Sequence, residues 1–186
     1  MTQMNENFRI LIVDDNRELG CILEEYLADQ GQVESADNGK EALALHDTRA
    51  YDLIITDLNM PELNGIELIK RIKEGNKVPE FIIVTAYASL DTAMEAVKLG
   101  AFDYIVKPFR IEEVALVVKN AKDKILLKKV NTQLFNQLKS FYGEVARYKK
   151  NPGPETLNSM MQTEDIMREL EKFERRKRDD PTRTTE

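Results

Sequence analysis

Five polar residues stand at or directly after the ends of short apolar runs, and together they could carry chemistry. They are Asp14, Asp15, Asp57, Thr85 and Lys107. Carboxylates that converge on one cleft repel each other and raise each other's pKa values unless a cation joins them. Mg²⁺ meets that demand, because it commonly binds through carboxylates, a backbone carbonyl and water. A lysine and a hydroxyl beside such an ion suit the oxygens of a phosphoryl group, so the set predicts phosphoryl transfer.

Asp57 is the carboxylate best placed to accept the phosphoryl group, because it stands alone after the central apolar run. An aspartyl phosphate is a known form of covalent catalysis. Two other phosphate chemistries fit the sequence less well. Phosphotransferases of the haloacid-dehalogenase type carry a second Asp two residues after the first, and this chain has Asn59 there. A nucleotide-binding P-loop, G-x-x-x-x-G-K-[ST], is absent from the sequence.

The apolar runs before these residues predict strands that are buried on both faces of a parallel sheet, because they are short and rich in Ile and Val. The predicted strands cover residues 8–13, 32–36, 52–56, 81–85 and 102–106. Helical spacing of apolar residues follows each of the first four strands. This alternation predicts a doubly wound α/β fold, in which ligands bind outside the carboxyl ends of the strands.

Each of the first four predicted helices has candidates for its inward face. In the first helix these are Leu19, Ile22, Leu23, Tyr26 and Leu27, and in the fourth they are Ala93, Val97 and Leu99. In the second helix they are Ala42, Leu43 and Leu45, and in the third they are Ile66, Leu68, Ile69 and Ile72. The second helix is expected to begin at Asn38-Gly39 and the third at Gly65. Glycines close the first, third and fourth helices, as is common at helix ends.

A fifth helix is predicted from Ile111 to about Lys150, because neither Gly nor Pro occurs before Gly143. Its apolar residues step by four and three, which is the spacing of a coiled coil. This apolar seam consists of Leu134, Leu138, Phe141, Val145 and Tyr148, preceded by either Leu127 and Asn131 or Leu126 and Val130. The seam is expected to pack against a second copy of the chain or against a later helix of the same chain.

The chain is expected to have three parts. Residues 8–122 form the α/β domain, residues 123–150 the helical extension, and residues 151–186 a linker with a short helix and a polar tail. The linker begins with the helix-breaking run Asn151-Pro152-Gly153-Pro154. The apolar face of the short amphipathic helix consists of Leu157, Met160, Met161, Ile166, Met167, Leu170 and Phe173.

The polar set resembles the receiver domain of bacterial two-component response regulators. The matching motifs are Asp14-Asp15, Asp57, Thr85-Ala86 and Lys107-Pro108-Phe109. The loop Asp-Leu-Asn-Met-Pro-Glu-Leu-Asn-Gly at 57–65 is similar to the loop that follows the phosphorylated aspartate in this family. The resemblance covers residues 8–122. The loop after Asp57 and the long fifth helix are most similar to those of receivers that precede an ATPase module in enhancer-binding transcription regulators.

This resemblance implies a flavodoxin-like (βα)5 sheet and phosphorylation of Asp57 by a sensor histidine kinase or a phosphotransfer protein. It implies that Mg²⁺ is held by Asp15, Asp57 and the backbone carbonyl of Asn59, with Asp14 acting mainly through a bound water. A receiver is not an enzyme acting on a separate substrate, although it takes part in its own phosphoryl transfer and hydrolysis.

The resemblance also implies roles for the residues around the phosphoryl group. Lys107 would contact this group, Thr85 would move toward it, and Tyr104 at the switch-aromatic position would rotate inward. Asn59 and Tyr87 lie two residues after the phosphoacceptor and the threonine, where they would flank the path of the hydrolytic water. A bulky Tyr87 is expected to lengthen the lifetime of the phosphoryl group.

The composition of the chain limits the kinds of partner and the compartment that we expect. The chain has 27 basic and 33 acidic residues, a net charge of -6, so it lacks the global positive field of a non-specific nucleic-acid binder. No apolar run approaches the roughly 20 residues of a membrane span. The single cysteine, Cys21, allows no internal disulfide, which indicates the reducing cytoplasm.

Two classes of function remain open. In the first, which we favour, the protein is a short response regulator whose phosphorylation switches its binding to an unknown downstream protein. It would form a homodimer through the extended fifth helix. In the second, the sequence is the receiver and linker of a transcription regulator whose ATPase and DNA-binding domains are missing.

Overall fold

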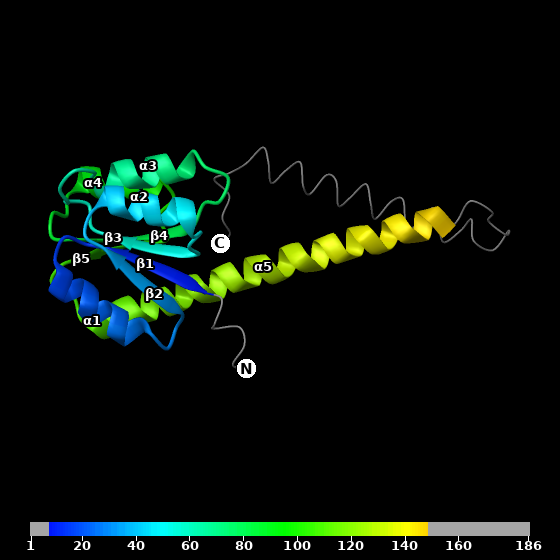
Figure 1. Ribbon diagram of the computed structural model, residues 1–186, viewed down its shortest axis with the longest axis horizontal. Helices are drawn as coiled ribbons and strands as arrows, with labels where there is room; N and C mark the ends of the chain where they lie inside the picture. Colours follow the sequence, from blue (N-terminus) through cyan, green and yellow to red (C-terminus); the bar gives the residue numbers. More distant parts are fainter. Residues whose placement is uncertain (1–7, 149–186) are drawn as a thin grey trace. The chain divides into compact units, whose positions relative to one another are not determined.

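The computed structural model describes residues 8–148, with side chains described for 8–142 (Figure 1). Strands and helices alternate along the chain. The strands are β1 (Arg9–Val13), β2 (Gln32–Ala36), β3 (Leu53–Thr56), β4 (Glu80–Thr85) and β5 (Asp103–Val106). The helices are α1 (Arg17–Leu27), α2 (Gly39–Thr48), α3 (Gly65–Lys73), α4 (Leu90–Lys98) and α5 (Ile111–Tyr148).

The strands form one parallel sheet in the order β2-β1-β3-β4-β5, so β3 is central. This order confirms the predicted doubly wound fold with a long fifth helix. The predicted end of that helix near Lys150 and the predicted short helix beyond Pro154 lie outside the described residues.

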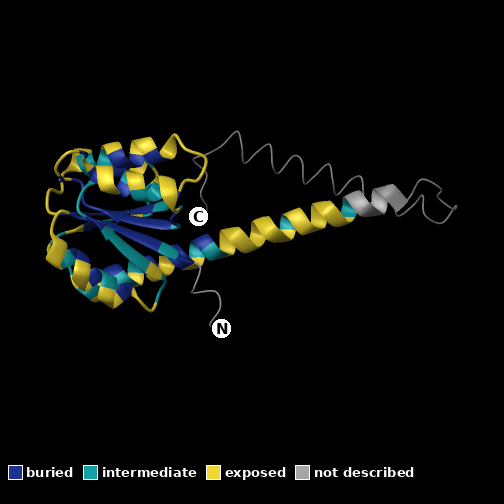
Figure 2. Cartoon of the chain, viewed as in Figure 1, coloured by how far each residue is buried: buried dark blue, intermediate teal, exposed yellow. Residues whose placement is uncertain are grey.

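Apolar side chains of the sheet fill two cores, one on each face. Helices α2, α3 and α4 cover one face, and α1 and the first part of α5 cover the other (Figures 1 and 2). In β1 and β3 neighbouring residues point to opposite cores, so β3 is buried throughout and β1 is buried after Arg9. On the second face, α5 contributes Val114, Val118, Ala121 and Ile125.

The structure corrects part of the predicted inward faces of α1 and α4. Ile22 and Tyr26 are exposed, whereas Leu23 and Leu27 are buried. A step of three residues turns a side chain by about 60° from the contact line, which is enough to bring it to the edge of a helix that packs on a sheet. On α4 the predicted inner residue Val97 is 77% exposed, and Ala96 is buried instead.

Basic side chains of α5 contact the edge of the sheet where the strands begin. The Lys129 ammonium lies 2.6 Å from the Asp52 carboxylate, and Lys124 lies 3.7 Å from Glu80. Lys122 donates a hydrogen bond to the carbonyl oxygen of Gln30. These contacts, together with buried Ile125, hold α5 against the α/β domain beyond residue 122.

Several of the apolar residues that follow on α5 are exposed. They are Leu127, Val130, Leu134, Leu138 and Phe141. Figure 2 shows this stretch mostly in the colour of exposed residues. Both predicted registers therefore contribute exposed residues, Leu127 to one and Val130 to the other.

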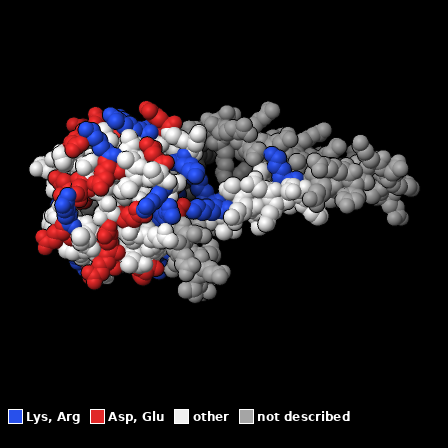
Figure 3. All heavy atoms as spheres, viewed as in Figure 1, with Lys and Arg blue, Asp and Glu red and all other residues white. Residues whose placement is uncertain are grey.

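Two further surface properties bear on the possible partners. None of the helices described between residues 8 and 148 combines the length and apolar character needed to cross a bilayer. Figure 3 shows acidic and basic side chains interspersed on the visible face of the described residues.

Candidate functional site

The carboxyl ends of the strands bring together the polar residues that the sequence singled out. Asp14 and Asp15 follow β1, Asp57 follows β3, and the fourth and fifth strands end at Thr85 and before Lys107. One carboxylate oxygen from each of the three aspartates lies within 4.8 Å of the others. Asp14 and Asp57 are buried, and Asp15 is exposed. This oxygen cluster has the composition of a magnesium site.

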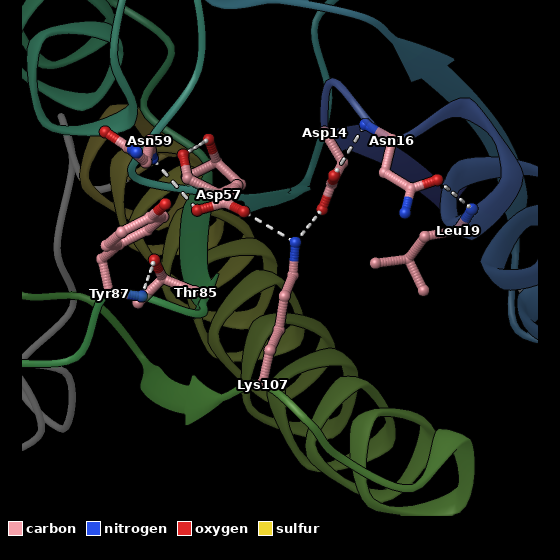
Figure 4. A network of polar contacts seen from close by, with 9 residues as sticks. Asp14, Asn16, Leu19, Asp57, Asn59, Thr85, Tyr87 and Lys107 are labelled. Carbon is pink, nitrogen blue, oxygen red and sulfur yellow. Dashed lines mark hydrogen bonds and ion pairs between the residues drawn. The ribbon is translucent and has the colours of Figure 1, made fainter.

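Lys107 bridges two of these carboxylates (Figure 4). Its Nζ lies 2.6 Å from Asp14 Oδ2 and 2.6 Å from Asp57 Oδ2. The other oxygen of each carboxylate accepts a backbone hydrogen bond, from Asn16 N to Asp14 and from Asn59 N to Asp57, each at 3.0 Å. Both buried carboxylates are therefore held in defined orientations.

Burial and ion pairing act in opposite directions on these groups. Burial raises the pKa of Asp14, and this effect outweighs the hydrogen bond from Lys107. For Lys107, burial lowers the pKa, but the hydrogen bonds to Asp14 and Asp57 outweigh it and raise the pKa above its usual value. Lys107 therefore remains a cation near neutral pH, as a contact for a phosphoryl group requires.

Thr85 is buried beside Lys107, whose backbone N–H donates to the Thr85 carbonyl oxygen at 2.8 Å. The Thr85 hydroxyl oxygen accepts a hydrogen bond from the backbone N–H of Tyr87 at 3.2 Å. The Tyr87 side chain is 67% exposed, and its ring points toward the loop that carries Asp57 and Asn59 (Figure 4). Tyr87 and Asn59 therefore lie at the open side of the site.

Tyr104 lies on β5 and packs against the core beneath α2, α3 and α4. Its hydroxyl is 2.9 Å from the Thr92 hydroxyl, at the start of α4. Sequence reasoning did not single out Thr92. A usable signal was present, because Ser89 and Thr92 have the spacing of a capping box, in which each side chain bonds to the other residue's backbone N–H.

The start of α3 positions the loop after Asp57. The Asn64 side chain caps this helix by accepting a hydrogen bond from Glu67 N at 2.9 Å. Gly65 N donates to the Leu58 carbonyl at 3.1 Å. A Cβ atom at Gly65 would collide with the carbonyl oxygen of Asp57. The missing side chain thus allows α3 to begin directly against the backbone of the candidate phosphoacceptor.

Replacing Gly65 with Ala is expected to displace the Asp57 backbone and to lower the free energy of unfolding by about 1–3 kcal/mol. Urea unfolding measures the stability, and the rate of phosphorylation by acetyl phosphate reports on the site. Gly20→Ala is the matched control, because a Cβ there would meet Ser35 at an ordinary 3.7 Å. Equal stability and phosphorylation of both variants would contradict this role of Gly65.

The comparison with protein families identifies the family to which this fold belongs. Residues 10–119 match the family model described as the response regulator receiver domain. The chain belongs to this receiver family. The predicted receiver family and the predicted fold are thereby confirmed.

Curated and solved relatives of this receiver support the assignment. Regulatory protein AtoC of Escherichia coli (strain K12) is 39% identical over 130 residues, which cover 69% of this chain and 28% of AtoC. DNA-binding transcriptional regulator NtrC of Salmonella typhimurium is 37% identical over 113 residues, which cover 60% of this chain and 24% of NtrC. The chain therefore spans about a quarter of the length of these relatives.

Among solved structures, the receiver domain of the Francisella response regulator 1452 is 33% identical to this chain, with a TM-score of 0.59. The match covers 63% of this chain and 98% of that structure. The α/β domain therefore corresponds to an entire receiver.

Proposed function

We propose that Asp57 accepts a phosphoryl group from a histidine kinase or a phosphotransfer protein, with Mg²⁺ as cofactor, and that this modification switches binding to a downstream protein. The arrangement of Lys107 carries the proposal, because its ammonium lies 2.6 Å from both Asp14 and Asp57. A half-buried cation at this place can stabilise the charge of a transferring phosphoryl group. Incubation with acetyl phosphate and Mg²⁺ should add the mass of one phosphoryl group, and a chain of unchanged mass would contradict the proposal.

Transfer requires an exchange of bonds at phosphorus. A carboxylate oxygen of Asp57 forms the new P–O bond while the P–N bond to the donor imidazole breaks, and the imidazole nitrogen leaves with the electron pair. The Lys107 ammonium and the Thr85 hydroxyl donate hydrogen bonds to phosphoryl oxygens. In dephosphorylation, a water oxygen forms the new bond to phosphorus while the P–O bond to Asp57 breaks, which restores the carboxylate and releases inorganic phosphate. The protein takes part in both steps, and we propose no other substrate.

The acidic cluster is suited to Mg²⁺, which binds hard oxygen ligands. Asp15, Asp57 and the backbone carbonyl of Asn59 would hold the ion directly, and Asp14 would act through a bound water. When bound, the ion would neutralise charge on the phosphoryl oxygens.

Replacing Asp15 with Asn should weaken magnesium binding by about tenfold or more, because the site loses an anionic ligand. Stability should change little, since Asp15 is exposed. The dependence of the phosphorylation rate on Mg²⁺ concentration measures the effect. Asp91→Asn, at an exposed position on α4, is the matched control. An unchanged magnesium dependence in Asp15→Asn would exclude Asp15 as a ligand.

Tyr87→Ala should shorten the lifetime of the phosphoryl group several-fold, because the exposed ring shields the side of the site that faces water. Loss of phosphoryl mass over time, after removal of the donor, measures this lifetime. Tyr26→Ala is the matched control, since Tyr26 is an exposed tyrosine of α1. Equal decay rates in the wild type and in Tyr87→Ala would rule out shielding.

The exposed seam of α5 supports a homodimer as part of the proposal. Leu127, Leu134, Leu138 and Phe141 follow the coiled-coil spacing and are exposed. A long helix without a packed face is only marginally stable in water, so the seam requires a partner surface. A fold-back of the segment after Pro154 is the competing explanation, and the two differ in molecular mass.

The relatives support a second candidate, in which this chain is the receiver part of a longer transcription regulator. AtoC is named a regulatory protein and NtrC a DNA-binding transcriptional regulator, and the chain spans about a quarter of each. The phosphoryl chemistry is the same in both candidates. The proposed cytoplasmic location is also the same, because a transcription regulator must reach the DNA there. Sequencing the encoding gene past codon 186 distinguishes them: a reading frame that continues into an ATP-binding motif favours the longer regulator.

A further inference from the structure

A hydrogen-bond network at the start of α4 includes the side chain of Tyr104. The Thr92 hydroxyl oxygen lies 3.0 Å from Ser89 N, 3.0 Å from the Ser89 carbonyl oxygen and 2.9 Å from the Tyr104 hydroxyl. The Ser89 side chain completes the cap by accepting a hydrogen bond from Thr92 N at 3.1 Å. The same threonine therefore caps α4 and contacts β5.

The Thr92 hydroxyl has more polar neighbours than it can bond at once. It has one proton to donate and two lone pairs that accept. One lone pair can receive the Ser89 N–H, and its proton can go to the Ser89 carbonyl oxygen. The Ser89 hydroxyl lies 3.1 Å away and the Tyr104 hydroxyl 2.9 Å away, and in each of these two pairs either oxygen can be the donor. The Tyr104 hydroxyl is the nearest of the four partners.

Helix α4 has few other attachments. Its buried side chain is Ala96, whereas α3 buries Leu68, Ile69 and Ile72. Two lysines of α3 contact the C-terminal half of α4: Lys70 lies 2.7 Å from Glu95, and Lys73 donates to the Leu99 carbonyl. The hydrogen bond between Tyr104 and Thr92 lies instead at the N-terminal half of α4, next to the loop that carries Tyr87.

We propose that the hydrogen bond between Tyr104 and Thr92 holds both the ring and the first turn of α4 in the unphosphorylated conformation. This inference rests on the proposed function and on the inward rotation of Tyr104 after phosphorylation of Asp57, which the resemblance to receivers implies. Rotation must break this bond, whereas the cap bonds between Thr92 and Ser89 can persist. The bond therefore opposes activation, and by linkage its loss should favour phosphorylation.

Fluorine NMR on the full chain labelled with 3-fluorotyrosine tests the proposal. The Tyr104→Phe variant identifies the Tyr104 resonance, because it lacks that signal. In Thr92→Val, which keeps the side-chain shape but removes the hydroxyl, the Tyr104 resonance should shift in the absence of phosphoryl donor. Thr92→Ser should match the wild type. Ser89→Ala, which loses part of the cap but keeps the phenol contact, should leave the resonance unchanged.

Beryllofluoride with Mg²⁺, which mimics a phosphoryl group, separates this proposal from the proposed function. If the wild-type Tyr104 resonance does not respond to beryllofluoride, the inward rotation is wrong. If it responds, Thr92→Val should shift the resonance in the same direction without beryllofluoride. A Thr92→Val resonance identical to that of the unliganded wild type would overturn the role of Thr92.

The rate of phosphorylation by acetyl phosphate gives a second measurement. Thr92→Val should react roughly fivefold faster than the wild type, the change expected when one neutral hydrogen bond no longer opposes activation. Thr92→Ser should react at the wild-type rate. Equal rates for Thr92→Val and the wild type would contradict the proposed opposition to activation.

Discussion

Replacing Asp57 with Asn is expected to abolish phosphorylation by acetyl phosphate, because an amide cannot form the acyl phosphate. The fold should persist, since the Asn side chain oxygen can still accept the hydrogen bond that Asp57 Oδ1 receives from Asn59 N. Intact-mass measurement in the presence of Mg²⁺ detects the product directly. The mass of the variant should remain unchanged over times in which the wild type is fully converted.

A matched control for this experiment is Asp47→Asn, which removes an exposed carboxylate of α2. It should be phosphorylated at the wild-type rate. Phosphoryl transfer that persists in Asp57→Asn would place the acceptor elsewhere, and peptide mapping of the modified chain would identify it.

The second large effect is expected at Leu138, on the exposed seam of α5. Leu138→Asp would place a carboxylate from each chain at the centre of a coiled-coil interface, where burying unpaired charge is costly. The dissociation constant of the dimer should rise about a hundredfold or more, from the loss of two leucine contacts alone. Sedimentation equilibrium at tens of micromolar should give a dimer for the wild type and a monomer for the variant.

A control variant and a second measurement make this prediction specific. Ser140→Asp adds the same charge at an exposed position two residues along the helix and should leave the dimer intact. Phosphorylation of Leu138→Asp should proceed normally, because Asp57 and Lys107 belong to the α/β domain. A wild-type monomer would reject the coiled coil, and a dimer that survives Leu138→Asp would locate the interface at other residues.

The fold was predictable because local pattern and tertiary structure agree throughout the domain. Continuous Ile and Val runs occur where the sheet is buried on both faces, and helical spacing separates them. The sequence was less informative about how many rows of side chains on each helix the sheet covers. Ile22, Tyr26 and Val97 match the helical spacing and yet are exposed, because only the row of side chains closest to the sheet is covered.

The candidate site was predictable as a set of residues but not as a set of bonds. Parallel strands bring their carboxyl ends to one edge, so the positions of Asp14, Asp57 and Lys107 follow from topology. The simultaneous contact of Lys107 with both carboxylates depends on side-chain conformation. The bond between Thr92 and Tyr104 depends on how α4 lies over β5, which no local pattern encodes.

One continuous helix serves both the receiver core and the exposed seam, and this sharing has a thermodynamic consequence. Val118 and Ile125 of α5 are buried in the core, and Leu134 and Leu138 of the same helix are exposed. In the proposed coiled-coil dimer, unfolding of the receiver would release one end of a helix whose other end is held by association. Free energy gained by that association would therefore also oppose unfolding of the phosphorylation domain. By mass action, the melting temperature of the receiver should rise with protein concentration, so the abundance of this regulator would itself set the stability of its switch.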